Sequence, residues 1–71
     1  MMLGGRKVAC PNEVFIEKNP QTGVDDIHGV FHNKKEGGYD QNLFWVEATE
    51  ENIQALINAE VIRSKDDLAK K

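Results

Sequence analysis

Residues 42–48 read NLFWVEA, and this stretch decides which fold the chain can adopt. Its consecutive apolar side chains favour a strand that is apolar on both faces. On a strand, Phe44 and Val46 point to one face, whereas Leu43 and Trp45 point to the other. A single packed helix covers only one face of a sheet, so the pattern predicts an apolar face that the helix leaves open.

A helix is predicted directly after this strand. Thr49 is a favourable N-cap residue, and the two glutamates that follow it complement the helix dipole in the first turn. Apolar residues then recur at helical spacing from Ile53 onward, which predicts a helix over residues 50–59. Residues 60–63 either extend this helix or form a short edge strand.

Two turn signals divide the chain upstream of this strand. Residues 14–18 and 24–33 have the composition of strands, and a proline and a glycine within residues 19–23 predict a hairpin turn between them. The paired glycines of residues 34–38 suit a second reversal, which leads into the strand at 42–48. The three strands are therefore expected to form a meander.

These elements predict an α+β fold, namely a three- to four-stranded antiparallel β-meander with one packed C-terminal α-helix. An SH3-like small barrel is the rival architecture. The two differ in whether residues 7–10 and 61–62 pair with the meander. The sequence leaves both alternatives open.

The length of the chain limits it to one small domain. We expect a single domain over residues 1–71, with a core of about 7–62, a flexible N-terminal segment at 1–6 and a flexible C-terminal tail at 64–71. A chain this short buries a thin core, so little apolar surface remains to line a deep pocket.

The net charge and the single cysteine limit the kinds of partner and the cellular location that we expect. The net charge is −3, from twelve acidic and nine basic residues, which disfavours nonspecific binding to nucleic acid. A single cysteine, Cys10, cannot form an internal disulfide, which favours a reducing, cytoplasmic location. No signal peptide and no membrane-spanning apolar stretch is recognisable, so we expect no membrane partner.

No catalytic, metal or cofactor motif is recognisable. His28 and His32 share a strand face but lie about 13 Å apart by strand rise, which is too far to ligate one ion. Cys10 has no second cysteine or histidine at metal-ligand spacing. We therefore expect a protein that is not an enzyme and takes no cofactor, with both histidines on the surface around a buried Phe31.

The predicted open face and the second loop are the candidate contact surfaces. Tryptophan is enriched in interface hot spots, and lysines and a tyrosine gather in the loop. The predicted partner-binding residues are Leu43, Trp45, Tyr39, Lys34 and Lys35. The pattern favours a small non-enzymatic protein-binding module that occludes or bridges a larger partner. If the helix instead covers the Trp45 face, the Phe44 and Val46 face is the one left open.

In size, acidity and lack of a catalytic motif, the chain is similar to the small accessory proteins that phages and mobile elements use to inhibit or redirect host machinery. This resemblance implies a host protein such as RNA polymerase as the partner. The alternative is a small β-barrel that binds nucleic acid through Lys34, Lys35, Tyr39 and Trp45, by aromatic stacking beside basic side chains. A homodimer formed through the open apolar face is compatible with the same pattern.

Overall fold

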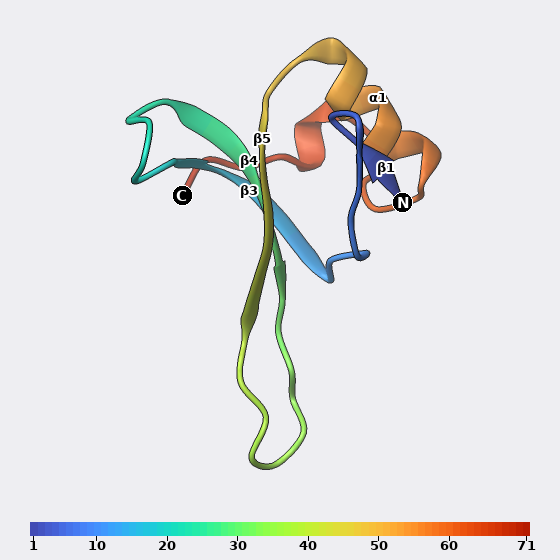
Figure 1. The fold of residues 1–71 in the computed structure, drawn as a ribbon. Coiled ribbons are helices and arrows are strands. Elements are labelled where there is room, and N and C mark those ends of the chain that lie inside the picture. The colour runs from blue at the N-terminus through green and yellow to red at the C-terminus, as the bar shows by residue number, and fades with distance from the viewer.

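The sheet at the centre of the fold is three-stranded and antiparallel, in the order β3-β4-β5, in a computed structural model that describes residues 1–71 (Figure 1). Its strands are β3 (Glu13–Lys18), β4 (Asp25–Phe31) and β5 (Gln41–Glu47). A positive φ at Gly23 helps to close the turn between β3 and β4. The predicted antiparallel meander and the α+β class are confirmed.

The sheet does not close into a barrel. Strands β1 (Met2–Leu3) and β2 (Arg6–Lys7) pair only with each other, because two glycines with positive φ turn the chain back between them. Residues 61–62 form no strand. Neither of the pieces that would have completed an SH3-like barrel joins the meander, so that alternative is not confirmed.

Helix α1 (Glu50–Asn58) begins as predicted and lies beside the sheet. The Thr49 hydroxyl accepts a hydrogen bond from the backbone N–H of Asn52 at 3.2 Å, which satisfies one of the free donors of the first turn. The Asn52 side chain in turn donates to the Glu47 carbonyl at 2.8 Å. These two bonds fix the path of the chain from the end of β5 into the helix.

The helix ends in a Schellman motif, which sets the conformation of the residues that follow it, 60–63. The N–H of Glu60 bonds to the carbonyl of Ile57, and the N–H of Val61 bonds to the carbonyl of Leu56, each at 3.0 Å. Glu60 takes the left-handed position with φ 61°. The chain therefore leaves the helix at this point and forms neither the helical extension nor the edge strand that the sequence allowed.

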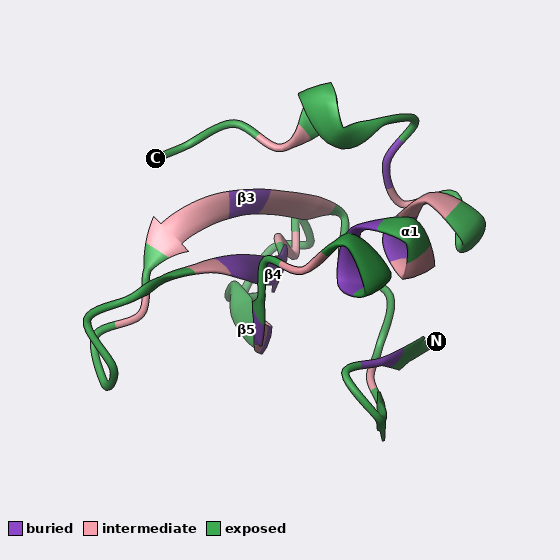
Figure 2. Cartoon of the chain, turned by 90° about the horizontal axis from the view of Figure 1, so that it is seen from above, coloured by how far each residue is buried: buried purple, intermediate pink, exposed green.

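The core lies between α1 and the face of the sheet that carries Phe44 and Val46 (Figure 2). The ring of Phe44 crosses directly over Gly29, where a Cβ atom would stand 2.3 Å from the ring. Glycine at this position lets the ring lie flat against the middle strand. The core cluster comprises Leu3, Ile27, Phe44, Val46, Ile53, Leu56 and Ile62.

A β-bulge interrupts the pairing of β4 with β5. Gly29 pairs with Phe44, but Val30 pairs with Asn42, so Leu43 is the extra residue on β5. Leu43 packs against the core on the helix side. The prediction that Leu43 shares the open face with Trp45 is therefore wrong, because an extra residue shifts the alternation of side chains.

Both ends of the chain contact the rest of the fold. Leu3 belongs to the buried core, so the core extends beyond the predicted range of 7–62. After a short 3₁₀ helix, η1 (Lys65–Asp67), the last residues run alongside β3 (Figure 2). Ile16 donates to the carbonyl of Ala69 and accepts from the N–H of Lys71, both at 2.8 Å. The tail thus covers the outer edge of β3.

Candidate functional site

The sheet face opposite α1 carries a row of three aromatic rings, one from each strand. Phe15 of β3 pairs with His28 of β4, which pairs with Trp45 of β5. The Trp45 and His28 rings are stacked, with centroids 3.7 Å apart and planes 11° apart. Phe15 meets His28 edge-on at 5.1 Å. The helix covers the Phe44 and Val46 face, so Trp45 lies on the face that the helix leaves open, which is the first of the two alternatives that the sequence allowed.

His28 is part of the packed structure of this face. His28 is 5% exposed, whereas Phe31 is 41% exposed. The prediction that His28 lies on the surface and Phe31 is buried is therefore wrong. His28 lies in the middle strand beneath the Trp45 ring. Phe31 is the last residue of β4, beyond the bulge and on the part of the chain that leads away from α1 (Figure 1).

Three carboxylates form a second row beside the aromatic row. Glu17 pairs with Asp26, which pairs with Glu47, and each lies two residues from an aromatic residue on its own strand. Side chains two residues apart on a strand share a face. We call this surface the open face; it consists of Phe15, Glu17, Asp26, His28, Trp45 and Glu47.

The carboxylates have few partners within the chain. Asp26 accepts a hydrogen bond from the side-chain amide of Asn19 at 3.0 Å, and Glu17 lies 3.8 Å from the Nδ1 atom of His28. No cluster of three or more histidine, cysteine or acidic side chains is arranged to hold a metal ion. Cys10 is exposed and unpaired.

The C-terminal lysine reaches onto the edge of the open face. Lys71 Nζ lies 4.2 Å from the centroid of the Phe15 ring and 3.6 Å from Glu13 Oε1. Sequence reasoning missed this contact because the tail has no apolar periodicity that would predict a place for it. The contact depends on the pairing of the tail with β3, which is a long-range interaction.

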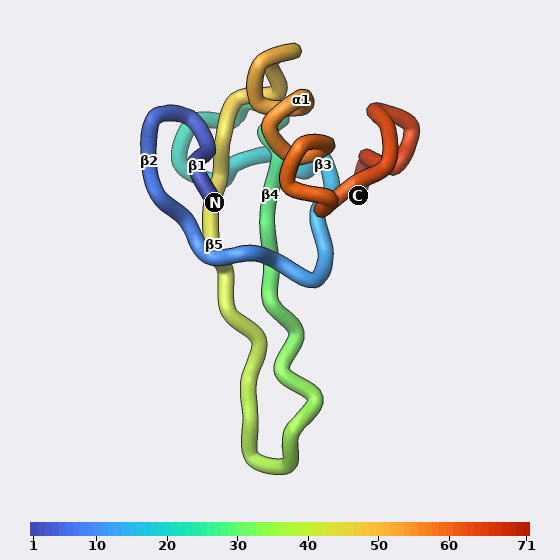
Figure 3. The backbone as a smooth tube through the Cα atoms, turned by 90° about the vertical axis from the view of Figure 1, so that its right-hand side faces the viewer, coloured from blue at the N-terminus to red at the C-terminus, as the bar shows by residue number.

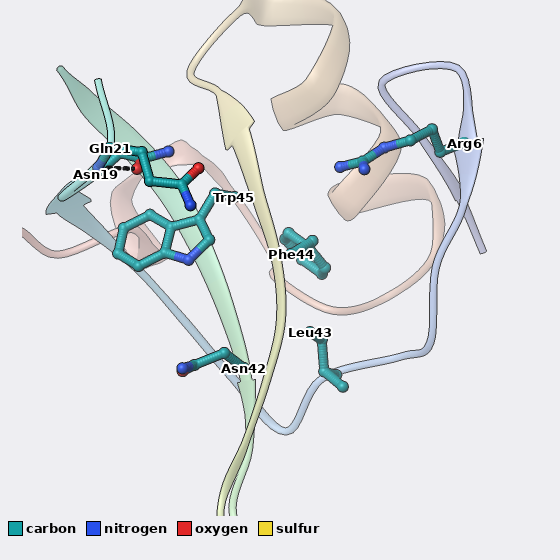
Figure 4. A pocket seen from close by; sticks show the side chains of 7 residues that line it. All are labelled: Arg6, Asn19, Gln21, Asn42, Leu43, Phe44 and Trp45. Atoms are coloured by element: carbon teal, nitrogen blue, oxygen red, sulfur yellow. Dashed lines mark hydrogen bonds between the residues drawn. The ribbon is translucent and has the colours of Figure 1, made fainter. Parts of the chain in front are cut away.

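Trp45 also lines a shallow groove over the outer edge of β5, where no strand pairs (Figure 4). In Figure 4, Trp45 lies on one side of the strand, with Asn19 and Gln21 nearby. Leu43 lies on the other side. The backbone of β5 therefore separates the two residues of that strand that were predicted to bind a partner.

The other predicted contact residues lie on a projecting hairpin. Residues 32–40, which we call the arm, extend beyond the end of the sheet that faces away from α1 (Figures 1 and 3). Tyr39 is 73% exposed, and Lys34 and Lys35 are exposed as well. The structure therefore does not bring these three residues together with Trp45 in one compact site.

Polar contacts at its base attach the arm to β3. The His32 ring lies between Glu13, at 2.5 Å, and Asp40, at 2.7 Å. Two hydrogen bonds raise the pKa of His32; the bond to Glu13 has the larger effect and the bond to Asp40 the smaller. The bond to His32 lowers the pKa of Glu13. Asn12 exchanges two side-chain hydrogen bonds with the backbone of His32, at 2.8 and 2.9 Å.

The chain matches no protein-family model, no curated protein and no solved structure. Its fold is that of a small α+β domain with one open sheet face and a projecting arm. No helix of the structure is long and apolar enough to cross a membrane.

Proposed function

We propose that this chain is a non-enzymatic protein-binding module that binds a larger protein through the open face. The observation that supports the proposal is the position of Trp45. Its inner ring surface stacks on His28, and no helix covers its outer surface. A half-buried, rigidly held indole is the kind of anchor that contributes most to protein interfaces.

The arm supplies a second contact surface in this proposal. None of its residues is buried, so its sequence is not needed for the core. It nevertheless displays Tyr39, which is 73% exposed, and follows directly on the exposed Phe31. Exposed aromatic side chains without a role in the core favour contact with another molecule. Lys34 and Lys35 lie between them and complete the proposed contact residues of the arm.

The proposed action is to occlude or bridge a larger assembly. RNA polymerase, which the resemblance to phage accessory proteins implies, is the first partner to test. Two observations weigh against the alternative of a nucleic-acid-binding barrel. The sheet is open, and Trp45 lies beside three carboxylates, which repel phosphate groups.

Binding to purified RNA polymerase, and affinity capture from a bacterial lysate, test the proposal with three forms of the chain. These are the wild type, Trp45→Ala, and Gln54→Ala as a matched control on the exposed side of α1. We expect Trp45→Ala to weaken binding by about thirtyfold, which is typical of a hot-spot truncation. Equal recovery of the same partner by the wild type and Trp45→Ala would exclude the open face as the interface.

The salt dependence of binding separates the two function classes. An interface centred on an aromatic ring keeps most of its affinity when salt is added, whereas binding to single-stranded nucleic acid weakens steeply. Titration with a single-stranded oligonucleotide serves as the direct comparison. Saturable oligonucleotide binding that depends on Lys34 and Lys35 would favour the alternative.

A further inference from the structure

We infer that the open face recognises a basic segment of its partner, with a lysine or arginine side chain seated on Trp45 beside the Glu17–Asp26–Glu47 row. This inference rests on the proposed protein-binding function and names the chemistry of the partner. Four observations on the open face lead to it: its charge, a buried ring nitrogen without a hydrogen-bond partner, a cation already bound at one end, and an indole without a cation at the other.

The first observation is the charge of the acidic row. Side chains that are directly opposite across neighbouring strands have Cβ atoms about 5 Å apart, and like charges at that distance repel each other. No lysine or arginine lies within ion-pair distance of Glu17, Asp26 or Glu47. The only polar hydrogen offered to Asp26 comes from the neutral amide of Asn19. A cation placed on this row therefore relieves repulsion that the chain itself does not neutralise.

The second observation is an unpartnered buried atom that points at the row. The ring of His28 is hydrogen-bonded on one side only, where Nε2 lies 3.0 Å from the amide oxygen of Asn42. The Nδ1 atom on the other side is buried and has no hydrogen-bond partner. Glu17 Oε1 lies 3.8 Å from this atom, beyond hydrogen-bond distance, and the Glu17 side chain is 39% exposed. Neither atom is hydrogen-bonded within the chain, so Glu17 is free to bind a group of the partner.

The third observation is that one end of the aromatic row already binds a cation. Lys71 Nζ lies over the Phe15 ring at 4.2 Å and beside Glu13 at 3.6 Å. An ammonium group between an aromatic ring and a carboxylate is the arrangement that we infer for the partner. The chain thus contains an example of the recognition chemistry on the same face.

The fourth observation is that the other end of the row has no such cation. Trp45 has the same row position on β5 as Phe15 has on β3, and Glu47 lies two residues away on the same face. Only the ring of Phe15 has a lysine seated over it. An indole attracts a cation more strongly than a phenyl ring does. The Trp45 end is therefore the place for a lysine or arginine from outside the chain.

The single tryptophan of the chain provides a direct test. The 71-residue chain is titrated with a short capped peptide of alternating glycine and arginine, and with the same peptide carrying citrulline in place of arginine. We expect the arginine peptide alone to change the Trp45 fluorescence in a saturable manner. Failure of the arginine peptide to bind, or equal binding of both peptides, would overturn the inference.

A matched pair of double variants separates local recognition from net charge. Glu17→Gln with Glu47→Gln removes two of the three carboxylates of the acidic row, whereas Glu50→Gln with Glu51→Gln removes two carboxylates from the first turn of α1. We expect roughly a tenfold loss of affinity for the arginine peptide in the first variant and less than a twofold change in the second. Equal losses in both would show a nonspecific charge effect and overturn the inference.

The same variants distinguish this inference from the proposed function. Suppose that Trp45→Ala abolishes partner binding but Glu17→Gln with Glu47→Gln leaves it unchanged. The proposed protein-binding function is then supported, and the inference that the partner segment is basic is wrong. Sedimentation equilibrium of the chain alone tests whether a second copy of the chain binds the open face. A dimer that Trp45→Ala dissociates would assign the open face to self-association and overturn the inference.

Discussion

The two faces of the sheet are made by the same three strands, yet their side chains are buried in different ways. On the helix face, Phe44 and Val46 are covered by side chains of α1, including Leu56, which is 0% exposed. On the open face, Trp45 is covered only by stacking on His28. Stacking within the sheet thus buries His28, whereas Trp45 itself stays half-exposed. Substitutions should therefore affect mainly stability on one face and mainly binding on the other.

The largest expected effect is on the helix face. Leu56→Ala removes a fully buried side chain and leaves a cavity between α1 and the sheet, so we expect a loss of about 3 kcal/mol in the free energy of unfolding. Urea denaturation measures the loss, with Gln54→Ala as the surface control. The comparison of faces fails if Trp45→Ala destabilises the protein more than Leu56→Ala does.

A smaller loss is expected at the close contact beneath Phe44. Gly29→Ala places a Cβ atom 2.3 Å from the Phe44 ring, which forces the ring or the middle strand to move. We expect a destabilisation of roughly 2 kcal/mol from this overpacking. The double variant with Phe44→Leu should lose less than the sum of the two single changes. Strict additivity in this double-mutant cycle would argue against the contact.

A stabilising change is expected at the end of α1. Glu60 takes a left-handed backbone conformation with φ 61°, which glycine adopts without the steric penalty of a side chain. Glu60→Gly should therefore raise the free energy of unfolding by about 1 kcal/mol. Thermal denaturation measures the change, and Asn58→Gly inside the helix should act in the opposite direction. A lower melting temperature for Glu60→Gly would contradict the Schellman ending.

The smallest effect concerns the base of the arm and its dependence on pH. The bonds to Glu13 and Asp40 raise the pKa of His32 above its ordinary value of 6.5. The stability from this charged ring is fully present below the unfolded-state pKa and is lost as pH rises through the raised pKa. Glu13 affects stability at acidic pH. The stability that its lowered pKa contributes is present above pH 4.5, its ordinary pKa, and is lost as pH falls through the lowered pKa.

An NMR titration of the His32 ring measures this shift directly. We expect a midpoint above 6.5 in the wild type and a downward shift of that midpoint in Glu13→Gln. Amide exchange in the arm should become faster above the midpoint, because the neutral ring binds the two carboxylates less strongly. A midpoint at or below 6.5 would mean that the two carboxylates do not hold the ring in solution.

Much of the fold follows from local patterns that can be recognised in the sequence. The apolar run at 42–48 specifies a strand, Thr49 specifies the start of the helix, and the turn at 19–23 specifies a hairpin. Each of these signals acts over a few residues, through backbone preferences and side-chain spacing. For this reason the meander and the helix could be predicted, whereas the choice of the sheet face that α1 covers stayed open.

The bulge and the buried histidine could not be predicted in the same way. A bulge at Leu43 depends on how β4 and β5 pair, and alternation within one strand contains no signal for it. His28 is buried because a tryptophan from another strand lies flat on it. Histidine is compatible with surface and interior positions, so its sequence neighbours did not determine its burial.

By itself, then, the sequence determined the three strands of the meander, the helix after them, their order, and the fact that one sheet face remains without a helix, but not the short β1–β2 pair. Only the tertiary structure decided that Leu43 turns to the helix side, that three carboxylates line up beside three rings, and that Lys71 reaches Phe15. The physical reason is range. Strand and helix preferences are local, whereas register, cross-strand rows and the docking of the tail arise only when distant segments pack together.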